Sequence, residues 1–230
     1  MKKALIVAGG SPISKENLSP YFNRYIVAAD RGTDMLKEYG IRPDLIIGDM
    51  DSVSKEGEKF IEEENIKREI FPYKKNLTDT EICLEKLIKC GFKDIVLVNT
   101  RGTRFDHELA SVFLLQKLYK KNINGKIIDN NNEIFYRERG TYNFSKDDKK
   151  YISIISLSHE SIFSTEGMAY EVKRISIFRE NPGLGVSNEI IKERASIKIH
   201  RGKVFIIKSK DWIFEILICK KLFAKAWNFW

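Results

Sequence analysis

The stretch Asp44-Leu-Ile-Ile-Gly-Asp-Met-Asp-Ser52 joins a short apolar run to two carboxylates that lie two residues apart. The run Leu45 to Ile47 is long enough for a buried strand and too short for a helix. Residues two apart in an extended chain point to the same side, so Asp49 and Asp51 project together from the carboxyl end of this strand. Ligands bind at that end of the strands in open α/β sheets. The stretch therefore predicts a core strand that ends in a pair of acidic side chains.

The two carboxylates repel each other unless a cation lies between them. Mg2+ takes oxygen ligands and bridges to phosphate, so Asp49 and Asp51 indicate a metal–phosphate site. A solvated acidic turn is the alternative interpretation of an isolated Asp-X-Asp motif. The choice between the two depends on what the rest of the chain contributes.

The composition is that of a globular protein: 230 residues, of which 43% are hydrophobic and 31% are charged. Lys and Arg number 40 against 32 Asp and Glu, a net charge of +8. The basic residues are scattered in short pairs, so we expect no nucleic-acid partner. Three cysteines without zinc spacing favour a reducing compartment. No segment approaches the roughly 18 apolar residues of a membrane span, so we expect a cytoplasmic protein with no membrane partner.

Strands and helices alternate through about residue 130. The expected strands lie at 4–8, 25–29, 44–52 with its loop, 68–71, 94–99 and 126–129, and the expected helices at 33–39, 54–65, from 78 to about 90, and from about 105 to 120. Thr78 and Glu81 fit a capping box at the start of the third helix. Leu109, Val112 and Phe113 are expected on one apolar face of the fourth. This alternation predicts an α/β domain with a mostly parallel sheet flanked by helices.

The second half of the chain has a different pattern. Short β-rich runs at 133–137, 151–157, 172–178, 195–200, 204–208 and 212–219 are separated by turn signals, with no convincing helix between them. We therefore predict an antiparallel β domain after the Asn-rich stretch, which divides the chain into domains at 1–131 and 132–230. The sequence does not decide whether the aromatic tail, residues 221–230, is a docking strand or an extension.

The polar signals of the first half fall at the carboxyl ends of predicted strands. They are Asp30, then Asp49 and Asp51, then residues 75–79, and then residues 101–107. This convergence places carboxylates and cations in one crevice, a mixture that suits a metal–polyphosphate. Neither a P-loop nor an intact G-x-G-x-x-G motif is present, so a nucleotide has to be bound in another way.

Five motifs, in this order and spacing, resemble the thiamine pyrophosphokinase (thiamin diphosphokinase) family. They are Ala29-Asp-Arg-Gly32, Gly48-Asp-Met-Asp-Ser52, Lys75-Asn-Leu-Thr-Asp79, Arg104-Phe-Asp-His107 and Gly185-Val-Ser-Asn-Glu189, and the likeness runs from about Ala4 to Ser209. The resemblance implies transfer of a diphosphoryl group from ATP to the thiamine hydroxyl, with Mg2+, to give thiamine diphosphate and AMP. It also implies an α/β N-terminal domain, an all-β sandwich C-terminal domain, and a homodimer with the active site at the subunit interface.

The resemblance also implies a role for each matching residue. Asp49, Asp51 and Asp79 match the acidic metal-site residues and, with Arg104, are the expected catalytic residues. The expected ATP-binding residues are Asp30, Lys75, Thr78, Arg104 and Asp106. Ser187 and Asn188 match the thiamine-binding motif. We interpret His107 as structural, because phosphoryl transfer depends mainly on positioning and charge neutralisation.

Two departures from the family pattern keep other functions open. Asn76 stands where the family has an acidic residue, and the loop 99–103 contains a single glycine. One alternative is a Mg2+-dependent nucleotide hydrolase that uses the same acidic residues. Another is a catalytically weak homologue that binds nucleotide or thiamine as a sensor.

Overall fold

The structure is a computed structural model of the chain, and it describes residues 1–71 and 77–211. The first half alternates strands and helices: β1 (Lys3–Val7), α1 (Lys15–Leu18), a 3-10 turn η1 (Ser19–Tyr21), β2 (Tyr25–Ala29), α2 (Gly32–Glu38), β3 (Leu45–Gly48), α3 (Lys55–Glu63), β4 (Arg68–Ile70), α4 (Asp79–Lys89), β5 (Asp94–Val98), α5 (Phe105–Lys120) and β6 (Asn124–Ile128). Each strand and helix predicted in this half is present. The predicted N-cap of α4 is also confirmed, since Thr78 Oγ1 accepts the backbone N–H of Glu81 at 3.2 Å.

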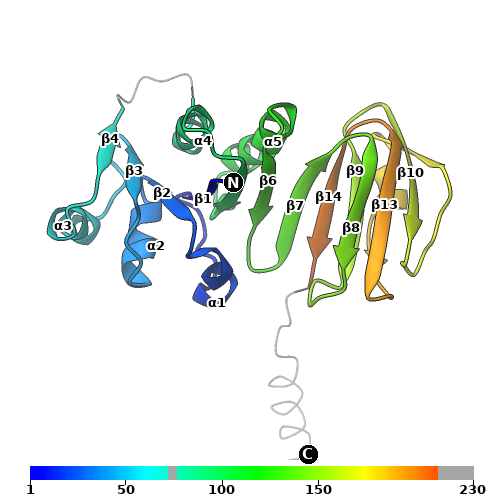
Figure 1. Cartoon of the computed structure of the whole chain (residues 1–230), viewed down its shortest axis with the longest axis horizontal. Coiled ribbons are helices and arrows are strands. Elements are labelled where there is room, and N and C mark those ends of the chain that lie inside the picture. Colours follow the sequence, from blue (N-terminus) through cyan, green and yellow to red (C-terminus); the bar gives the residue numbers. More distant parts are fainter. Residues whose placement is uncertain (72–76, 212–230) are drawn as a thin grey trace, which may run out of the picture.

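Ten strands form one sheet that runs through both halves of the chain. Its order is β12-β9-β14-β7-β6-β5-β1-β2-β3-β4, and the six strands from β6 to β4 are parallel (Figure 1). Consecutive parallel strands need crossover connections, and the helices supply them. The parallel strands are therefore aligned with all their carboxyl ends at one edge, where their following loops meet.

Helices cover both faces of the parallel strands. In Figure 1, α4 and α5 lie on one side of the sheet, and α1, α2 and α3 lie on the other. Alternate residues of each strand point to opposite faces, so the strands divide their side chains between two cores. Leu84 of α4 and Leu118 of α5 pack against Ile6 and Leu97 in one core, whereas Leu36 of α2 packs with residues of the opposite strand face. Burial on both faces explains why these strands are continuous apolar runs.

The buried face of α5 differs from the predicted one. Leu114, Leu115 and Leu118 are buried, whereas Leu109 and Phe113 are 43% and 45% exposed. The helix carries apolar residues on more than one face, and a 3.6-residue period alone does not tell which face meets the sheet. The apolar face predicted to contain Leu109, Val112 and Phe113 is thus not the buried one: Val112 is half-buried, and Leu109 and Phe113 are exposed.

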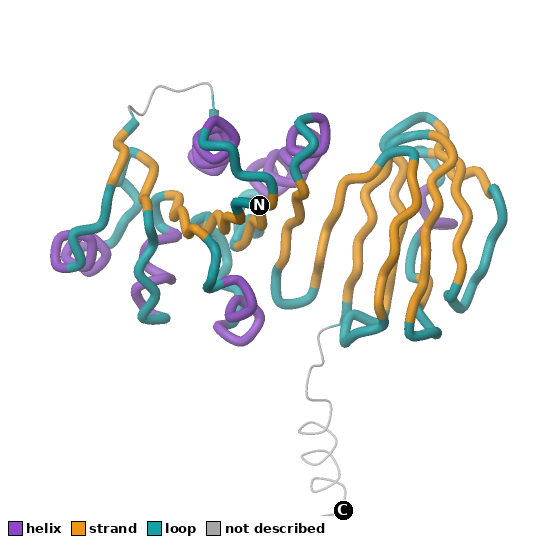
Figure 2. The backbone as a smooth tube through the Cα atoms, in the orientation of Figure 1, coloured by secondary structure: helices purple, strands orange, loops and turns teal. Residues whose placement is uncertain are grey.

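Between residues 132 and 211, the regular elements of the described chain are strands and one short 3-10 turn, as Figure 2 shows. Its elements are β7 (Asn132–Arg137), β8 (Gly140–Ser145), β9 (Tyr151–Ser156), β10 (Glu160–Glu166), β11 (Ile175–Phe178), a 3-10 turn η2 (Pro182–Gly185), β12 (Asn188–Glu189), β13 (Arg194–Arg201) and β14 (Val204–Ser209). Strands β11-β10-β13-β8 form a second, antiparallel sheet. Side chains of both sheets, among them Ile154, Phe163, Ile197 and Ile206, share one core, which confirms the predicted β-sandwich.

Strands β8, β10 and β12 are additional to the runs predicted from the sequence. The division at residues 131 and 132 coincides with the start of β7, but β7 pairs with β6, so the first sheet continues across it. The division into two domains there stays a prediction. The predicted strand at 212–219 and the aromatic tail lie outside the described residues. No helix in the described ranges is long and apolar enough to cross a membrane.

Candidate active site

A crevice of about 350 Å3 lies at the carboxyl ends of the parallel strands. It is lined by the loops that follow β1, β2, β3 and β5 and by the first residues of α4 and α5. The lining includes Gly9, Gly10, Asp30, Arg31, Ser52, Thr78, Asp79, Thr80, Asn99 to Arg104, His107 and Ser111. This is the edge of the sheet at which the sequence predicted the site, and four of the predicted site residues, Asp30, Thr78, Asp79 and Arg104, line the crevice.

The backbone is strained at three of the strand ends that form the crevice. Asp30 after β2, Met50 after β3 and Asn99 after β5 have φ values of 41°, 67° and 57°. Residues with a side chain adopt this left-handed region at a cost, and such residues gather at functional sites. Asp30 and Asn99 line the crevice, whereas the Met50 side chain packs against the core next to α2 and α3.

The Asp30 carboxyl group is held against the neighbouring strand end. Asp30 is buried, and its Oδ1 accepts the backbone N–H of Met50 at 3.3 Å. A Cβ added to Gly48 would lie 1.4 Å from this oxygen, so no residue other than glycine fits there without displacing the carboxyl group. The glycine in the motif Gly48-Asp-Met-Asp-Ser52 is thus explained by the approach of Asp30.

Crowding of carboxyl groups changes the titration of Asp30. Burial, and then the charge of Asp79 and a hydrogen bond with it, raise the pKa of Asp30 from 3.8 to about 7, and the charge of Asp49 acts in the same direction. The amide of Met50 opposes this shift. Three acidic residues from the ends of β2 and β3 and the start of α4 are therefore close enough to interact.

The predicted acidic triad is only partly gathered. Asp79 lines the crevice, and Asp49 lies near enough to affect the pKa of Asp30. Asp51 is exposed, and its backbone N–H donates to Asp49 Oδ1 at 3.3 Å. Within residues 1–71 and 77–211, no three acidic, histidine or cysteine side chains converge closely enough to hold a metal ion by themselves.

Arginines supply the positive charge of the crevice. Arg104 lines it and is bonded to Asp106, with 2.6 Å between Nη2 and Oδ2. The Arg104 guanidinium lowers the pKa of Asp106. Arg101 is paired with Glu108 and Asp129, at 3.4 Å from each. Arg31 also lines the crevice and forms no ion pair within the described part of the chain. The predicted ATP-binding residue Lys75 lies outside the described residues.

The loop after β1 is fixed to the loop after β5. The amide of Gly10 donates to the carbonyl of Asn99 at 2.8 Å, and the amide of Ser11 donates to the carbonyl of Arg101 at 2.6 Å. A Cβ on Gly10 would come within 2.0 Å of the Arg101 carbonyl oxygen, so glycine is required at this approach. The side chain of Asn99 is buried and accepts the amide of Ile13 at 2.9 Å. These hydrogen bonds fix the side of the crevice that the β1 and β5 loops form. The chain achieves this without a P-loop motif.

The predicted thiamine-binding residues lie beside a second cavity, of about 340 Å3, within the β-sandwich. Asn188 contributes to its lining, and Ser187 adopts a left-handed φ of 61°. The Asn188 amide is fully engaged with Tyr170: Oδ1 accepts the Tyr170 N–H at 3.0 Å, and Nδ2 donates to the Tyr170 carbonyl at 2.8 Å. Asn188 therefore fixes the backbone at Tyr170, whose side chain is 72% exposed.

Several lining residues were not predicted as site residues. Asn99 and Arg31 lie within motifs that the sequence analysis quoted or noted, but no role was assigned to them. The signal that identifies Asn99 is its position directly after an apolar strand. A polar side chain buried there needs hydrogen-bond partners. His107 was interpreted as structural, and it lines the crevice.

The chain thus combines an open α/β sheet, with acidic and basic side chains at its carboxyl edge, and a β-sandwich. Family models described as "Thiamin pyrophosphokinase, catalytic domain" and "Thiamin pyrophosphokinase, vitamin B1 binding domain" match residues 21–127 and 141–204. The thiamine pyrophosphokinase of Bacillus subtilis (strain 168) is 31% identical over 217 residues, which are 92% of this chain and 100% of the relative. The chain belongs to the thiamin pyrophosphokinase family, and the predicted enzyme, a thiamine diphosphokinase, is confirmed.

Solved structures agree with this assignment. The crystal structure of thiamine pyrophosphokinase from Bacillus subtilis has a TM-score of 0.84 at 30% identity, covering 91% of this chain and 100% of that one. The enzyme from Geobacillus thermodenitrificans has a TM-score of 0.79 at 28% identity, covering 91% and 99%. Yeast thiamin pyrophosphokinase, at 15% identity, covers 91% and 86% with a TM-score of 0.76, which shows the shared fold alone.

The raised pKa of Asp30 makes the stability of the metal-free protein depend on pH. The folded protein binds a proton at Asp30 up to about pH 7, whereas the unfolded chain releases it near pH 4, so stability is lost as the pH rises between these values. Asp30→Asn keeps the carbonyl that accepts from Met50 and removes the charge. We expect its Tm in EDTA to exceed that of the wild type by an amount that grows from pH 4 to pH 7 and then levels off.

Glu62→Gln is the matched control, because Glu62 is exposed on α3 and outside the crevice. Its Tm difference from the wild type should not change over the same pH range. Equal pH dependence of the two variants would contradict the assignment of a raised pKa to Asp30.

Proposed function

We propose that the crevice binds ATP and that its diphosphoryl group is transferred to the hydroxyl of thiamine, giving thiamine diphosphate and AMP. The observation that carries this proposal is the combination of crowded carboxyl groups, Asp30 and Asp79, with Arg31 and Arg104 around one cavity at the strand ends. Carboxylates suit a metal ion and guanidinium groups suit phosphate oxygens, so the two together fit a metal-bound polyphosphate.

The donor set fits Mg2+. It consists of carboxylate oxygens alone, and burial, followed by the nearby charge of Asp79, raises the pKa of Asp30, which places acidic groups close to one another. Mg2+ usually keeps several waters and needs one or two carboxylates besides substrate phosphates, so an incomplete protein site is expected. We propose Asp49, Asp51 and Asp79 as the residues that hold it. When bound, the ion would neutralise phosphate charge.

The basic residues have the role of orienting the phosphates. Arg104 offers a planar fork of N–H donors, and its pairing with Asp106 fixes the direction of the guanidinium. Arg31 is a second donor at the opposite loop of the crevice. Lys75 and Thr78 are proposed to complete the ATP site. In phosphoryl transfer the protein acts mainly through such positioning, so no dedicated general base is assigned.

Thiamine is proposed to bind next to the Ser187-Asn188 segment. Asn188 acts as a positioning residue, because both ends of its amide are used to hold the Tyr170 backbone. Thiamine carries a permanent positive charge on its thiazolium ring, which the acidic residues of the crevice attract. Its hydroxyl then has to reach the polyphosphate, so the sandwich segment and the crevice must be brought together.

A homodimer with shared sites is proposed to bring them together. The crevice is lined by residues between 8 and 111, and the sandwich cavity by residues between 152 and 197; among the described residues, none lines both. The exposed stripe of Phe105, Leu109 and Phe113 begins beside Arg104, and a second exposed apolar patch of Tyr170, Leu184, Val186 and Ile191 surrounds the sandwich cavity. Two-fold symmetry would pair each stripe with the patch of the other subunit and cover both.

A cytoplasmic location stays a prediction from cysteine usage and composition. Two alternative functions, a Mg2+-dependent nucleotide hydrolase and a catalytically weak sensor, are distinguished from the proposed reaction by the following test.

Mass spectrometry of the protein with ATP, Mg2+ and thiamine tests the reaction. We expect AMP and thiamine diphosphate in equal amounts, with no AMP when thiamine is omitted. Nucleotide cleavage that is independent of thiamine would favour the hydrolase. Binding of both ligands without any product would favour the sensor.

Mixing two inactive variants tests the shared site. Asp51→Asn removes a proposed metal ligand, and Asn188→Ala removes the support of Tyr170 in the sandwich; we expect each to lower kcat by on the order of 10²-fold. If each site takes its crevice from one subunit and its sandwich segment from the other, a mixed dimer has one intact site. Activity should then recover to about a quarter of the wild-type value after random reassociation, since half of the dimers are mixed.

The control mixes Asp51→Asn with Asp79→Asn, whose defects lie in the same crevice. No mixed dimer of this pair has an intact site, so activity should stay at the level of the parents. Recovery by both mixtures, or by neither when mass analysis confirms mixed dimers, would contradict the shared-site model.

A further inference from the structure

A hydrogen-bonded array on the outer face of the second sheet has no role in the proposed reaction. Inward-facing residues of β10 and β13, such as Phe163 and Ile199, are buried in the sandwich. Ser164 and His200 alternate with them and face outward. Ser164 Oγ and His200 Nε2 are 2.7 Å apart, and His200 Nδ1 lies 3.3 Å from a guanidinium nitrogen of Arg174.

The donors and acceptors of this array can be assigned. The guanidinium of Arg174 has no acceptor, so it donates to Nδ1 of a neutral His200. The imidazole proton is then on Nε2 and donates to Ser164 Oγ. The same oxygen accepts the backbone N–H of Arg174 at 2.9 Å. Both lone pairs of the Ser164 hydroxyl are used, and its own proton is left to donate outward.

Arg174 adopts a strained backbone conformation in this array, with a φ of 51°. Of the seven non-glycine residues with positive φ in the described chain, Asp30 and Asn99 line the crevice. An L-residue at positive φ persists where surrounding contacts hold it, and such positions often have a function. Here the contacts are those of Ser164 and His200: the backbone N–H of Arg174 donates to Ser164 Oγ, and its guanidinium lies against His200 Nδ1, on the other side of the imidazole ring.

Two more cations share this face. Lys198 pairs directly with Ser164 across β10 and β13, and Arg139 precedes Gly140, which pairs with Ile199. Both cations, together with Arg174, hold the pKa of His200 below its usual value, although burial is the largest cause. None of these three side chains forms an ion pair with a carboxylate in the described residues, and Glu166, the nearest acidic residue along β10, pairs with Ser196 in the strand register.

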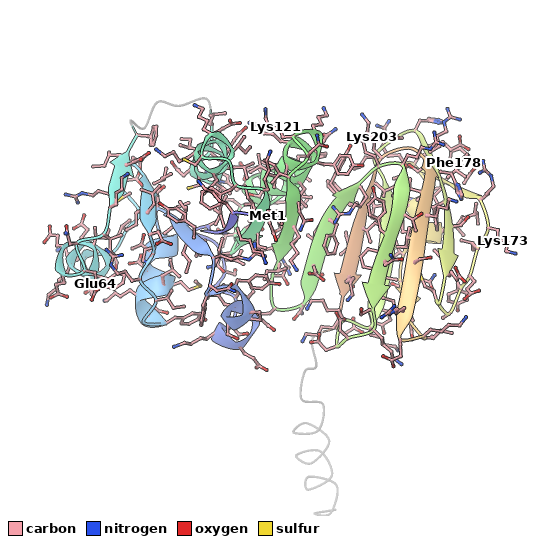
Figure 3. All side chains as sticks on the ribbon, in the orientation of Figure 1. Met1, Glu64, Lys121, Lys173, Phe178 and Lys203 are labelled. Atoms are coloured by element: carbon pink, nitrogen blue, oxygen red, sulfur yellow. The ribbon has the colours of Figure 1, made fainter. Side chains whose placement is uncertain are left out.

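We propose that Ser164, Arg174, Lys198 and Arg139 form a binding site for the phosphate group of a small molecule, distinct from the catalytic crevice. Three exposed cations without carboxylate partners and one outward hydroxyl donor suit a tetrahedral dianion. His200 is the positioning residue that sets the direction of Arg174 and of the Ser164 proton. Lys173, the neighbour of Arg174, and Glu64 lie at opposite ends of the molecule in Figure 3, so the site is at the end of the sandwich remote from α3.

The test is nuclear magnetic resonance of protein labelled with 15N at its three histidines, which are His107, His159 and His200. The His200 signals are assigned by their loss in His200→Gln. Inorganic phosphate, and separately inorganic diphosphate, is added at about pH 8, where phosphate is a dianion and imidazole is neutral. Matched additions of sodium chloride control for ionic strength. We expect a saturable shift of the His200 signals.

Binding at the catalytic crevice is separated from binding at this site by the other histidines. His107 lines the crevice and reports phosphate bound there, so failure of the proposed reaction would not affect the His200 result. A shift of the His107 signals alone, with His200 unchanged, would overturn the proposal.

Arg174→Gly is the decisive variant, because glycine adopts the positive φ without strain and the guanidinium is removed. We expect it to weaken phosphate binding at His200 by at least about fivefold, as the loss of a charge-assisted contact requires. Lys198→Ala should act in the same direction. Lys173→Ala removes an equal charge from the adjacent exposed residue and should change the affinity by less than about twofold. Equal losses in Lys173→Ala and Arg174→Gly would show a general charge effect and overturn the site.

Discussion

The approach of the Asp30 carboxyl group to Gly48 is the constraint on which the crevice depends. It fixes the end of β2 against the end of β3, and it leaves room for no side chain at residue 48. Asp30 and Met50 both adopt left-handed φ values beside this contact, and the Met50 N–H donates to the Asp30 carboxyl group. A buried acidic group and strained turns are both unfavourable for folding and gather at functional sites, so their presence together supports the proposed binding of a ligand in the crevice.

The parallel sheet makes this arrangement possible. Its apolar strands are buried on both faces and align their carboxyl ends, while α4 and α5 begin at that same edge. Rigid strands hold the ends of the loops, and the amide pairing of Gly10 and Ser11 with the β5 loop joins the remaining side of the crevice. Acidic residues and arginines can therefore be opposed across a cavity without a glycine-rich phosphate loop.

The sequence predicted the strands of the parallel sheet well, because burial on both faces makes them continuous apolar runs. Strands β8 and β10 were missed, since each contains only two large apolar or aromatic side chains and no apolar run is formed. The apolar face predicted for α5 is not the one that is buried, because the helix has apolar residues on more than one face. The presence of Asp30, Thr78, Asp79 and Arg104 at the crevice followed from motif order. The role of Asn188 in holding Tyr170 depends on a contact between residues 18 positions apart, which motif spacing does not reveal.

The central claim is that the crevice at the strand ends binds the polyphosphate of ATP. A crystal structure with Mg2+ and a non-hydrolysable ATP analogue tests it most directly. The account predicts the phosphate chain between Asp79 and the Arg31 and Arg104 side chains, with the metal ion on the acidic residues. Phosphates bound elsewhere, with the crevice filled by water at saturating analogue, would contradict it.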